Sequence, residues 1–295
     1  MIVGGVDIGS LSAKAVIMEG EKLLSWSIIL TRPDSIETAR EVMEQALKNV
    51  DLSLDQIKYI VSTGYGRVNV PFAQKNITEV SCHALGSHWL FPEVHTVLDM
   101  GGQDCKAIRC DEHGRVMSFA MNDKCGAGTG RYLERIGAML GLSPDEIGPL
   151  SLQTIEGPVL INSYCAVFAE RNIQLLVRQG KHRNDILAGA CEAITERIYS
   201  LLARVRVQEA FSISGGLAKN SGVVKRLENK LGVRAYIAQE PQIVGALGAA
   251  LFARIRYGEI TESTASPAPD SAWQPEAAWQ CGQQSQQGMS ALWNR

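Results

Sequence analysis

At residues 96–104 the sequence reads TVLDMGGQD, a short apolar run that ends in an acidic residue and two glycines. A second apolar run, Cys105 to Cys110, follows at once, so a β-hairpin is predicted. Glycines let backbone N–H groups approach phosphate oxygens, and a carboxylate beside them can hold hydrated Mg²⁺. The hairpin therefore predicts a phosphate-binding tip, where an amide side chain could orient an attacking water. The candidate residues are Asp99, Gly101, Gly102 and Gln103.

The N-terminus repeats this design. Met1 to Ile8 is an apolar run that contains Asp7, a small polar turn follows, and Ala15 to Met18 resumes the apolar pattern. One such hairpin is weak evidence, because an ordinary hairpin with a helpful glycine looks the same. Two of them predict two similar domains that hold one nucleotide from opposite sides. The candidate nucleotide contacts in the first hairpin are Asp7, Gly9, Ser10, Ser12 and Lys14.

Two cysteines stand beside predicted helix starts. Residues 122–130 read NDKCGAGTG and precede a helical pattern, and residues 162–170 read NSYCAVFAE and lead into another. A helix start offers unpaired N–H groups and the positive end of a dipole, which suit an anion such as a thiolate-bound iron–sulfur cluster. A cubane cluster needs four thiolates. We therefore infer that Cys125 and Cys165 supply half of a cluster and that a second subunit supplies the rest.

The remaining chain alternates strand and helix patterns. Helices are predicted over 35–50 and 184–207, and short strands over 159–161 and 211–214. The last strand runs into a paired glycine, which lets a flat base or ribose lie on the backbone. A predicted helix from Pro241 to Tyr257 is rich in small residues, as close packing at a domain seam requires. The candidate adenosine contacts are Gly215, Gly216 and Asn220.

Four segments, taken in order, resemble the two phosphate segments, the adenosine segment and the connecting segment of the actin, sugar-kinase and heat-shock-chaperone ATPase superfamily. They are Asp7-Ile-Gly-Ser, Asp99-Met-Gly-Gly-Gln, Ser214-Gly-Gly and Gly245-Ala-Leu-Gly. With the cysteine motifs added, the chain resembles one branch, the activators of 2-hydroxyacyl-CoA dehydratases and the ATPase subunits of ATP-dependent benzoyl-CoA reductases. The resemblance covers about Met1 to Tyr257, and it is specific because the cysteine motifs are foreign to sugar kinases.

The resemblance implies an α/β fold of two actin-like or ribonuclease-H-like domains. Each would be a mixed sheet with flanking helices, and the nucleotide would lie in the cleft between them. The first domain would span 1–95, completed by a helix over 241–258. The second would span 96–240 and carry the cluster cysteines, and residues 259–295 would form a C-terminal tail.

The resemblance also implies a function, in which ATP hydrolysis drives a one-electron transfer from a [4Fe–4S] cluster that bridges a dimer. Each subunit would supply Cys125 and Cys165, and Mg-ATP would bind at the hairpins, with Asp7 and Asp99 carrying the Mg²⁺. The expected partners are a second ATPase subunit, identical or related, a dehydratase or reductase acting on CoA thioesters, and ferredoxin or flavodoxin as electron donor. The setting would be anaerobic. Both the activators and the reductase subunits share these motifs.

The composition limits the classes of protein that fit. The chain has 295 residues and a hydrophobic fraction of 45%, which suit two globular domains. Its formal net charge of -2 lacks the excess of basic residues that nucleic-acid binding requires. No apolar run reaches the ~18 residues of a transmembrane helix, and no signal peptide is visible, so no membrane association is expected. Seven scattered cysteines without a secreted disulfide framework predict the reducing cytoplasm.

The other cysteines are predicted to have no ligand role. Four lie in predicted strands or helices, where a free cysteine behaves as a small buried hydrophobe; they are Cys82, Cys105, Cys110 and Cys191. Cys281 is predicted to be an exposed thiol. Zinc is disfavoured because no C-x-x-C pair occurs, and a redox disulfide between Cys125 and Cys165 is a lesser alternative to a cluster.

From Ser263 the composition shifts to Pro, Ser, Ala and Gln, which is typical of a mobile segment. Yet three of the five tryptophans lie there: Trp273, Trp279 and Trp293. Such tails usually contain few aromatic residues. Either this tail docks on its own protein or on a partner, or its sequence is unselected.

Two other functions fit part of the sequence. A small-molecule kinase would keep both hairpins, but it needs a catalytic base near a sugar hydroxyl and has no use for the two cysteine motifs. A non-catalytic nucleotide-binding regulator would bring a DNA-binding or polymer-contact segment, and none is visible in the sequence.

Overall fold

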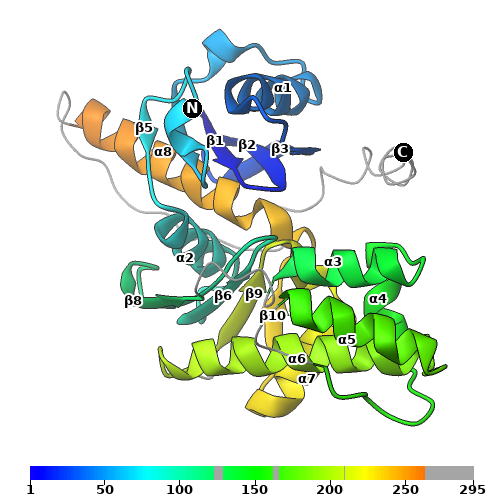
Figure 1. Cartoon of the computed structure of the whole chain (residues 1–295). Helices are drawn as coiled ribbons and strands as arrows, with labels where there is room; N and C mark the ends of the chain where they lie inside the picture. Colours follow the sequence, from blue (N-terminus) through cyan, green and yellow to red (C-terminus); the bar gives the residue numbers. More distant parts are fainter. Residues whose placement is uncertain (123–128, 162–165, 209, 263–295) are drawn as a thin grey trace. The chain divides into compact units, whose positions relative to one another are not determined.

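The computed structural model describes residues 1–122, 129–161, 166–208 and 210–262. The chain divides into two compact units (Figure 1). Met1–Leu90 and the chain from Gln242 onward form the first unit, and Phe91–Pro241 forms the second. Each unit is a five-stranded mixed sheet with flanking helices. The predicted α/β class with two mixed sheets is therefore confirmed.

The first unit has the strand order β3-β2-β1-β4-β5. β2 is antiparallel to both of its neighbours, β1 and β3, whereas β4 runs parallel to β1 and β5 parallel to β4. Helix α1 packs against β2 and β3, α8 packs against β1 and β4, and α2 packs against α8. The bounds are β1 Ile2–Ile8, β2 Ser12–Glu19, β3 Lys22–Leu30, β4 Tyr59–Thr63, β5 Lys75–Asn76, α1 Ser35–Lys48, α2 Glu79–Leu90 and α8 Val244–Glu262.

Local sequence explains where α1 begins and which side it buries. The Asp34 side chain accepts the N–H groups of Ile36 and Glu37 at 2.8 and 3.2 Å, which satisfies two donors of the first turn. The apolar residues recur at helical spacing and are buried against the sheet, where they join its core. They are Ala39, Val42, Met43, Ala46 and Leu47.

The second unit repeats this plan with the strand order β10-β9-β6-β7-β8. β6, β7 and β8 are antiparallel neighbours, and β9 and β10 extend the sheet in parallel. One core joins the sheet to the helices of this unit. The bounds are β6 Thr96–Met100, β7 Cys105–Cys110, β8 Val116–Met121, β9 Phe211–Ser214, β10 Ala235–Ile237, α3 Gly130–Met139, α4 Pro144–Ser151, α5 Ala166–Arg178, α6 Arg183–Ala203 and α7 Ser221–Leu231.

The strand predicted over 159–161 is wrong, because these residues form no regular element. Val159 instead lies against α6: its N–H donates to the carbonyl oxygen of Asp185 at 3.2 Å. The backbone of Val159 also approaches Gly189 so closely that a Cβ there would overlap the Val159 carbonyl oxygen. Val159 and Ile161 therefore lie against Gly189 of α6, whereas Leu160 between them is exposed. None of the described helices is long and apolar enough to cross a membrane.

Candidate functional site

Each sheet carries one hairpin in which an aspartate faces a lysine across two antiparallel strands. In the first unit Asp7 of β1 is paired with Lys14 of β2, and Lys14 Nζ lies 3.2 Å from Asp7 Oδ2. In the second unit Asp99 of β6 is paired with Lys106 of β7, and the corresponding distance is 3.4 Å. The aspartate and the lysine are seven residues apart in both hairpins. The hairpin design seen in the sequence is thus repeated at the level of single side chains.

The two hairpin tips are closed in the same way. The N–H of Gly9 donates to the Ser12 carbonyl at 3.2 Å, and the N–H of Gly101 donates to the Asp104 carbonyl at 2.9 Å. A Cβ would stand 2.8 Å from the Ser12 oxygen in the first tip and 2.9 Å from the Asp104 oxygen in the second, so neither glycine has room for a side chain. The donors left for an anion are the N–H groups next along the chain, which have no acceptor within the described residues. They belong to Ser10, Gly102 and Gln103.

A glycine with positive φ lies next to each aspartate. Gly64 (φ 85°) follows β4, and Gly215 (φ 86°) follows β9, the strands parallel to β1 and β6. This backbone region favours glycine. A Cβ at Gly215 would also stand 2.7 Å from Asp99 Oδ1, and one at Gly64 would overlap Asp7 Oδ1. Each aspartate is therefore positioned by a lysine and by a glycine backbone.

Three of these residues are absent from the sequence-based prediction: Lys106, Asp104 and Gly64. The Lys106 side chain is 2% exposed and contacts Asp104 Oδ1 at 2.6 Å in addition to Asp99. A signal for two of them exists in the sequence, whereas Asp104 aligns with Ser12 and has none. Aligning the two hairpins places Lys106 at the position of Lys14, and aligning the strands that follow places Gly64 at the position of Gly215.

The three predicted adenosine contacts differ in their surroundings. Gly215 is buried, and its N–H donates to the Pro241 carbonyl at 2.9 Å. Asn220 caps α7, because its Oδ1 accepts the N–H of Val223 at 3.0 Å. Gly216 begins the 3₁₀ turn Gly216–Lys219 and is exposed. Of the three, Gly216 offers its backbone most directly to a ligand.

The first cysteine motif is anchored to the second hairpin at its N-terminal end. Cys125 itself lies outside the described residues. Asn122 is described, and it forms two hydrogen bonds with Cys105 of β7. The N–H of Asn122 donates to the Cys105 carbonyl at 3.2 Å, and Asn122 Oδ1 accepts the Cys105 N–H at 2.7 Å. The motif therefore leaves the sheet from a fixed point beside the hairpin.

The motif is anchored to the same hairpin at its C-terminal end. The N–H of Gly130, the first residue of α3, donates to the Gly101 carbonyl at 3.2 Å. The N–H of Arg131 donates to the Gly102 carbonyl at 3.1 Å. The chain around the motif thus begins and ends on the hairpin whose tip is predicted to bind phosphate.

The helices that follow the two cysteines lie side by side. Cys165 also lies outside the described residues, and α5 begins at the next residue. Arg135 in the second turn of α3 and Glu170 in the second turn of α5 form an ion pair of 2.8 Å. An exposed pair contributes little to stability, but it shows that the two second turns are adjacent. Both helices also contribute buried isoleucines to one core.

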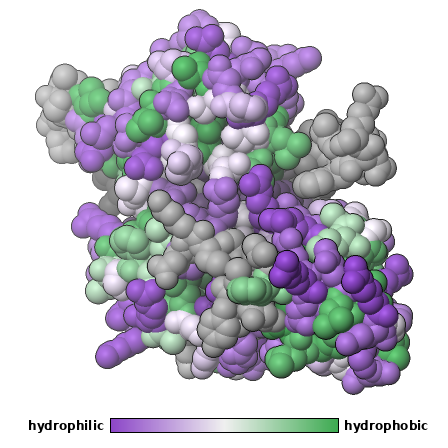
Figure 2. Space-filling view, viewed as in Figure 1, coloured by the Kyte–Doolittle hydropathy of each residue, from purple (hydrophilic) through white to green (hydrophobic). Residues whose placement is uncertain are grey.

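The outer surface of α5 is partly apolar. Phe168 is 60% exposed and Leu175 is 53% exposed, and the spacing of seven residues puts them on one helix face. Green apolar residues stand among purple hydrophilic ones in the lower right of Figure 2, where α4 and α5 lie in Figure 1. Such a surface suits contact with another protein.

The four cysteines predicted to be structural are free and buried. Burial raises the pKa of the Cys82 thiol to about 12, and it raises the pKa of the Cys105 thiol further, with the Asp99 carboxylate adding to the effect. Both groups therefore stay protonated at neutral pH and are poor metal ligands, because the ligand form is the thiolate. No group of three or more His, Cys, Asp and Glu side chains within the described ranges could hold a metal ion.

Burial predicts which thiols will react. With seven cysteines and four of them buried, we expect at most three to react with a disulfide reagent at pH 8 in the folded, iron-free protein. Denaturation should then expose all seven. Modification of Cys82 or Cys105 in the native protein, mapped by mass spectrometry, would contradict the assignment.

The chain was compared with known protein families and structures. Residues 5–253 match the model of the BadF/BadG/BcrA/BcrD ATPase family. The 2-hydroxyisocaproyl-CoA dehydratase activator of Clostridioides difficile is 38% identical over 264 residues, which are 89% of this chain and 97% of that protein. A subunit of the benzoyl-CoA reductase of Thauera aromatica is 33% identical over 270 residues, 88% of this chain and 95% of that protein.

A solved structure is similar along its whole length. It is the activator of the 2-hydroxyisocaproyl-CoA dehydratase from Clostridium difficile with bound ADPNP, with a TM-score of 0.84 and 37% identity. The match covers 92% of this chain and 100% of that one. The similarity confirms the actin-like ATPase fold expected from the sequence.

Proposed function

The chain belongs to the BadF/BadG/BcrA/BcrD ATPase family, and from this premise we propose that it couples ATP hydrolysis to the transfer of single low-potential electrons. The carrier would be a [4Fe–4S] cluster bridging two subunits, with Cys125 and Cys165 as the ligands from each. The acceptor would be an enzyme acting on CoA thioesters, a 2-hydroxyacyl-CoA dehydratase or a benzoyl-CoA reductase, as the names of the relatives suggest. The donor would be ferredoxin or flavodoxin in an anaerobic cytoplasm.

The two hairpins fit the phosphates and metal of Mg-ATP. Each tip leaves no room for a side chain, which is what close approach of a phosphate requires. Each also places an ammonium group beside a carboxylate at the strand end. In this proposal Asp7 and Asp99 bind the water shell of Mg²⁺, and Gln103 orients the attacking water. The phosphate contacts would come from Gly9, Ser10, Ser12, Lys14, Gly101 and Gly102, and the adenosine contacts from Gly215, Gly216 and Asn220.

The observation that carries the proposal is the double anchoring of the first cysteine motif. Four hydrogen bonds tie its two ends to β7 and to the Gly101–Gly102 tip. A change in the tip on loss of the γ-phosphate would therefore act on the C-terminal end of the motif directly and on its N-terminal end through β7. Coupling of this kind needs a different affinity of ATP for the two conformations.

The adjacency of α3 and α5 supports a shared site for the two cysteines. Gly130 and Ala166 begin helices whose second turns are joined by the Arg135–Glu170 pair. A helix rises 1.5 Å per residue, so the two helix starts lie within about 10 Å of that pair. The apolar face of α5 would then lie beside the site, where a second subunit could cover it.

Anaerobic purification tests the proposal. We expect a brown protein with about four iron atoms per dimer, because one cubane cluster holds four. ATP hydrolysis should accompany reduction of the acceptor enzyme. A colourless protein that hydrolyses ATP and phosphorylates a small molecule would instead identify a kinase of the same fold.

Co-purification distinguishes the two kinds of acceptor. A homodimer that associates only transiently with its target would indicate a dehydratase activator. A stable complex with a dissimilar ATPase subunit and with cluster-bearing subunits would indicate a reductase. In either case the thioester binds to the acceptor.

Asn122→Ala is expected to uncouple ATP hydrolysis from electron transfer. The substitution removes the acceptor of the Cys105 N–H and loosens one anchor of the cysteine motif. We expect the number of electrons delivered per ATP to fall about tenfold, which corresponds to about 1.4 kcal/mol of coupling free energy. Iron content should be unchanged. Asn122→Asp keeps an oxygen acceptor at the same place and is the matched control. An unchanged ratio in the alanine variant would show that this anchor carries no coupling.

A further inference from the structure

The turn that follows β4 packs closely on the end of β1. The N–H of Gly66 donates to the Ile8 carbonyl at 2.9 Å. A Cβ at Gly66 would stand 2.5 Å from Ile8 Cγ2, and one at Gly64 would stand 2.6 Å from the Ile8 carbonyl oxygen. Neither glycine has room for a side chain, so the turn fits directly against the strand that carries Asp7. Because Ile8 immediately precedes Gly9, the turn lies beside the first hairpin tip.

Arg67 is the next residue of this turn, and its side chain folds back over the strand end. Its backbone N–H and its Nη1 both donate to the Gly64 carbonyl, at 3.3 and 3.2 Å. Its own carbonyl accepts the Ser62 hydroxyl at 2.9 Å. These contacts place the guanidinium at the end of β4, next to Gly64, whose backbone packs against the Asp7 carboxylate.

The charged groups around this strand end are balanced in number but not in pairing. Burial raises the pKa of the Cys82 thiol, and the charges of Asp7, Glu79 and Arg67 also act on it, so these groups surround one buried point. With Lys14 the set contains two carboxylates and two cations. Asp7 pairs with Lys14. Arg67 forms no ion pair with any carboxylate among the described residues.

The guanidinium of Arg67 therefore has donors left for a ligand. A guanidinium carries five N–H donors in a planar fork, and within the described ranges the Arg67 side chain donates only to the Gly64 carbonyl. The residue is half-buried. Such a fork matches the oxygens of a phosphate, which can accept two parallel hydrogen bonds from it. The open N–H of Ser10 on the adjacent tip is a further donor for the same anion.

We propose that Arg67 binds phosphate oxygens of the nucleotide held at the first hairpin, an inference that rests on the proposed function. The guanidinium supplies a counter-charge to the polyphosphate, and the Gly64 carbonyl keeps it in place before the nucleotide arrives. Arg67 thus contributes to the affinity for the polyphosphate and not to the affinity for adenosine. It lies outside the phosphate and adenosine segments that the sequence displays.

Nucleotide affinity of the full chain, purified without oxygen, tests this contact. In Arg67→Gln the affinity for Mg-ATP is expected to fall about tenfold or more, as for loss of a hydrogen bond between charged groups. The affinity for adenosine, measured by displacement of a fluorescent ATP analogue, should stay the same. Arg67→Lys keeps the charge but not the fork, so its affinity for Mg-ATP should lie between those of the glutamine variant and the unaltered protein.

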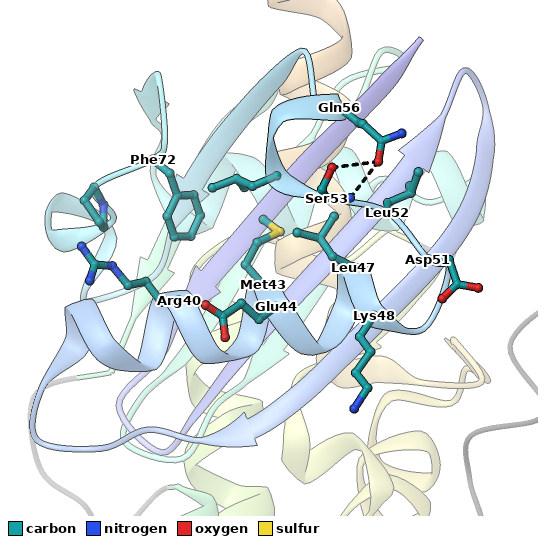
Figure 3. Close-up of a pocket in the computed structure, with 12 residues that line it drawn as sticks. Arg40, Met43, Glu44, Leu47, Lys48, Asp51, Leu52, Ser53, Gln56 and Phe72 are labelled. Carbon is teal, nitrogen blue, oxygen red and sulfur yellow. Dashed lines mark hydrogen bonds between the residues drawn. The ribbon is translucent and has the colours of Figure 1, made fainter.

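The matched control is Lys48→Gln, which removes the same charge from the far end of α1. This helix begins at Ser35, soon after Thr31, whose hydroxyl donates to the Gly9 carbonyl of the tip at 2.8 Å. Lys48 is thirteen residues further on, about 20 Å along the helix axis. It is exposed beside a pocket of about 960 Å³ (Figure 3). We expect its affinity for Mg-ATP to stay within a factor of about two of the unaltered protein.

Two results would overturn the role of Arg67 and leave the proposed function standing. One is an equal loss of affinity for Mg-ATP and for adenosine in Arg67→Gln, which would show that the substitution only disturbs the turn. The other is an affinity for Mg-ATP in Arg67→Gln that equals that of the Lys48→Gln control. An unaltered protein that binds no Mg-ATP would instead overturn both the contact and the proposed function.

Discussion

Replacing Cys125 or Cys165 by serine is expected to yield a colourless protein that still binds ATP. Serine cannot replace a thiolate as a soft ligand of iron, so a cluster that needs two thiolates from each subunit should be lost in either variant. Electron delivery to the acceptor should fall below detection. Iron analysis, visible absorbance and ATP affinity, all measured without oxygen, check this result.

The matched control for these variants is Cys191→Ala. Cys191 is buried, and burial raises the pKa of its thiol, so it should contribute nothing to iron binding. We expect iron content and colour to stay at the level of the unaltered protein. Full iron content in both serine variants would end the cluster proposal, whereas the nucleotide assignment would stand.

Asp99→Asn is expected to have the second large effect, a fall in ATP turnover of about 100-fold or more. A carboxylate that holds the metal's water shell contributes several kcal/mol to stabilising charge in the transition state, and asparagine lacks that charge. The side chain has nearly the same volume, so its fit against the Gly215 backbone should persist. Steady-state ATP hydrolysis with varied Mg²⁺ measures the effect.

Iron content should not change in Asp99→Asn, so the two large predictions separate the metal–nucleotide site from the cysteine site. Asp111→Asn is the control on the far end of β7. The Asp111 carboxylate accepts the N–H groups of His113 and Arg115 at 3.0 and 2.8 Å, and asparagine can accept them as well. Turnover within a factor of about two of the control would show that Asp99 is not at the reacting centre.

The sequence predicts the duplicated hairpins well because their determinants are local. An apolar run, a terminal aspartate and a glycine specify the strand, its end and the turn within ten residues, and both hairpins have this form. The same holds for α1, whose cap and buried face come from adjacent residues. These elements need no information from the rest of the fold.

Other features depend on contacts that the sequence does not display. In the sequence Lys106 is a single lysine within an apolar strand. Only the fold shows that it forms ion pairs with two carboxylates, those of Asp99 and Asp104. Residues 159–161 have strand-like composition, but they form no strand, and Val159 and Ile161 lie against α6. The hydrogen bonds of Asn122 and Gly130 join residues that are distant in sequence. The spacing of apolar residues along the chain therefore cannot predict them. The ligand roles of Cys125 and Cys165 stay a prediction.

The two hairpins share a backbone plan but differ in electrical balance. Asp7 and Lys14 cancel, with a formal sum of zero, whereas Lys106 faces both Asp99 and Asp104, which leaves one negative charge in excess. A divalent cation beside the second hairpin therefore gains an attraction that the first does not offer. Two hairpins with the same backbone plan would thus contribute unequally to one metal ion, the second attracting it more strongly than the first.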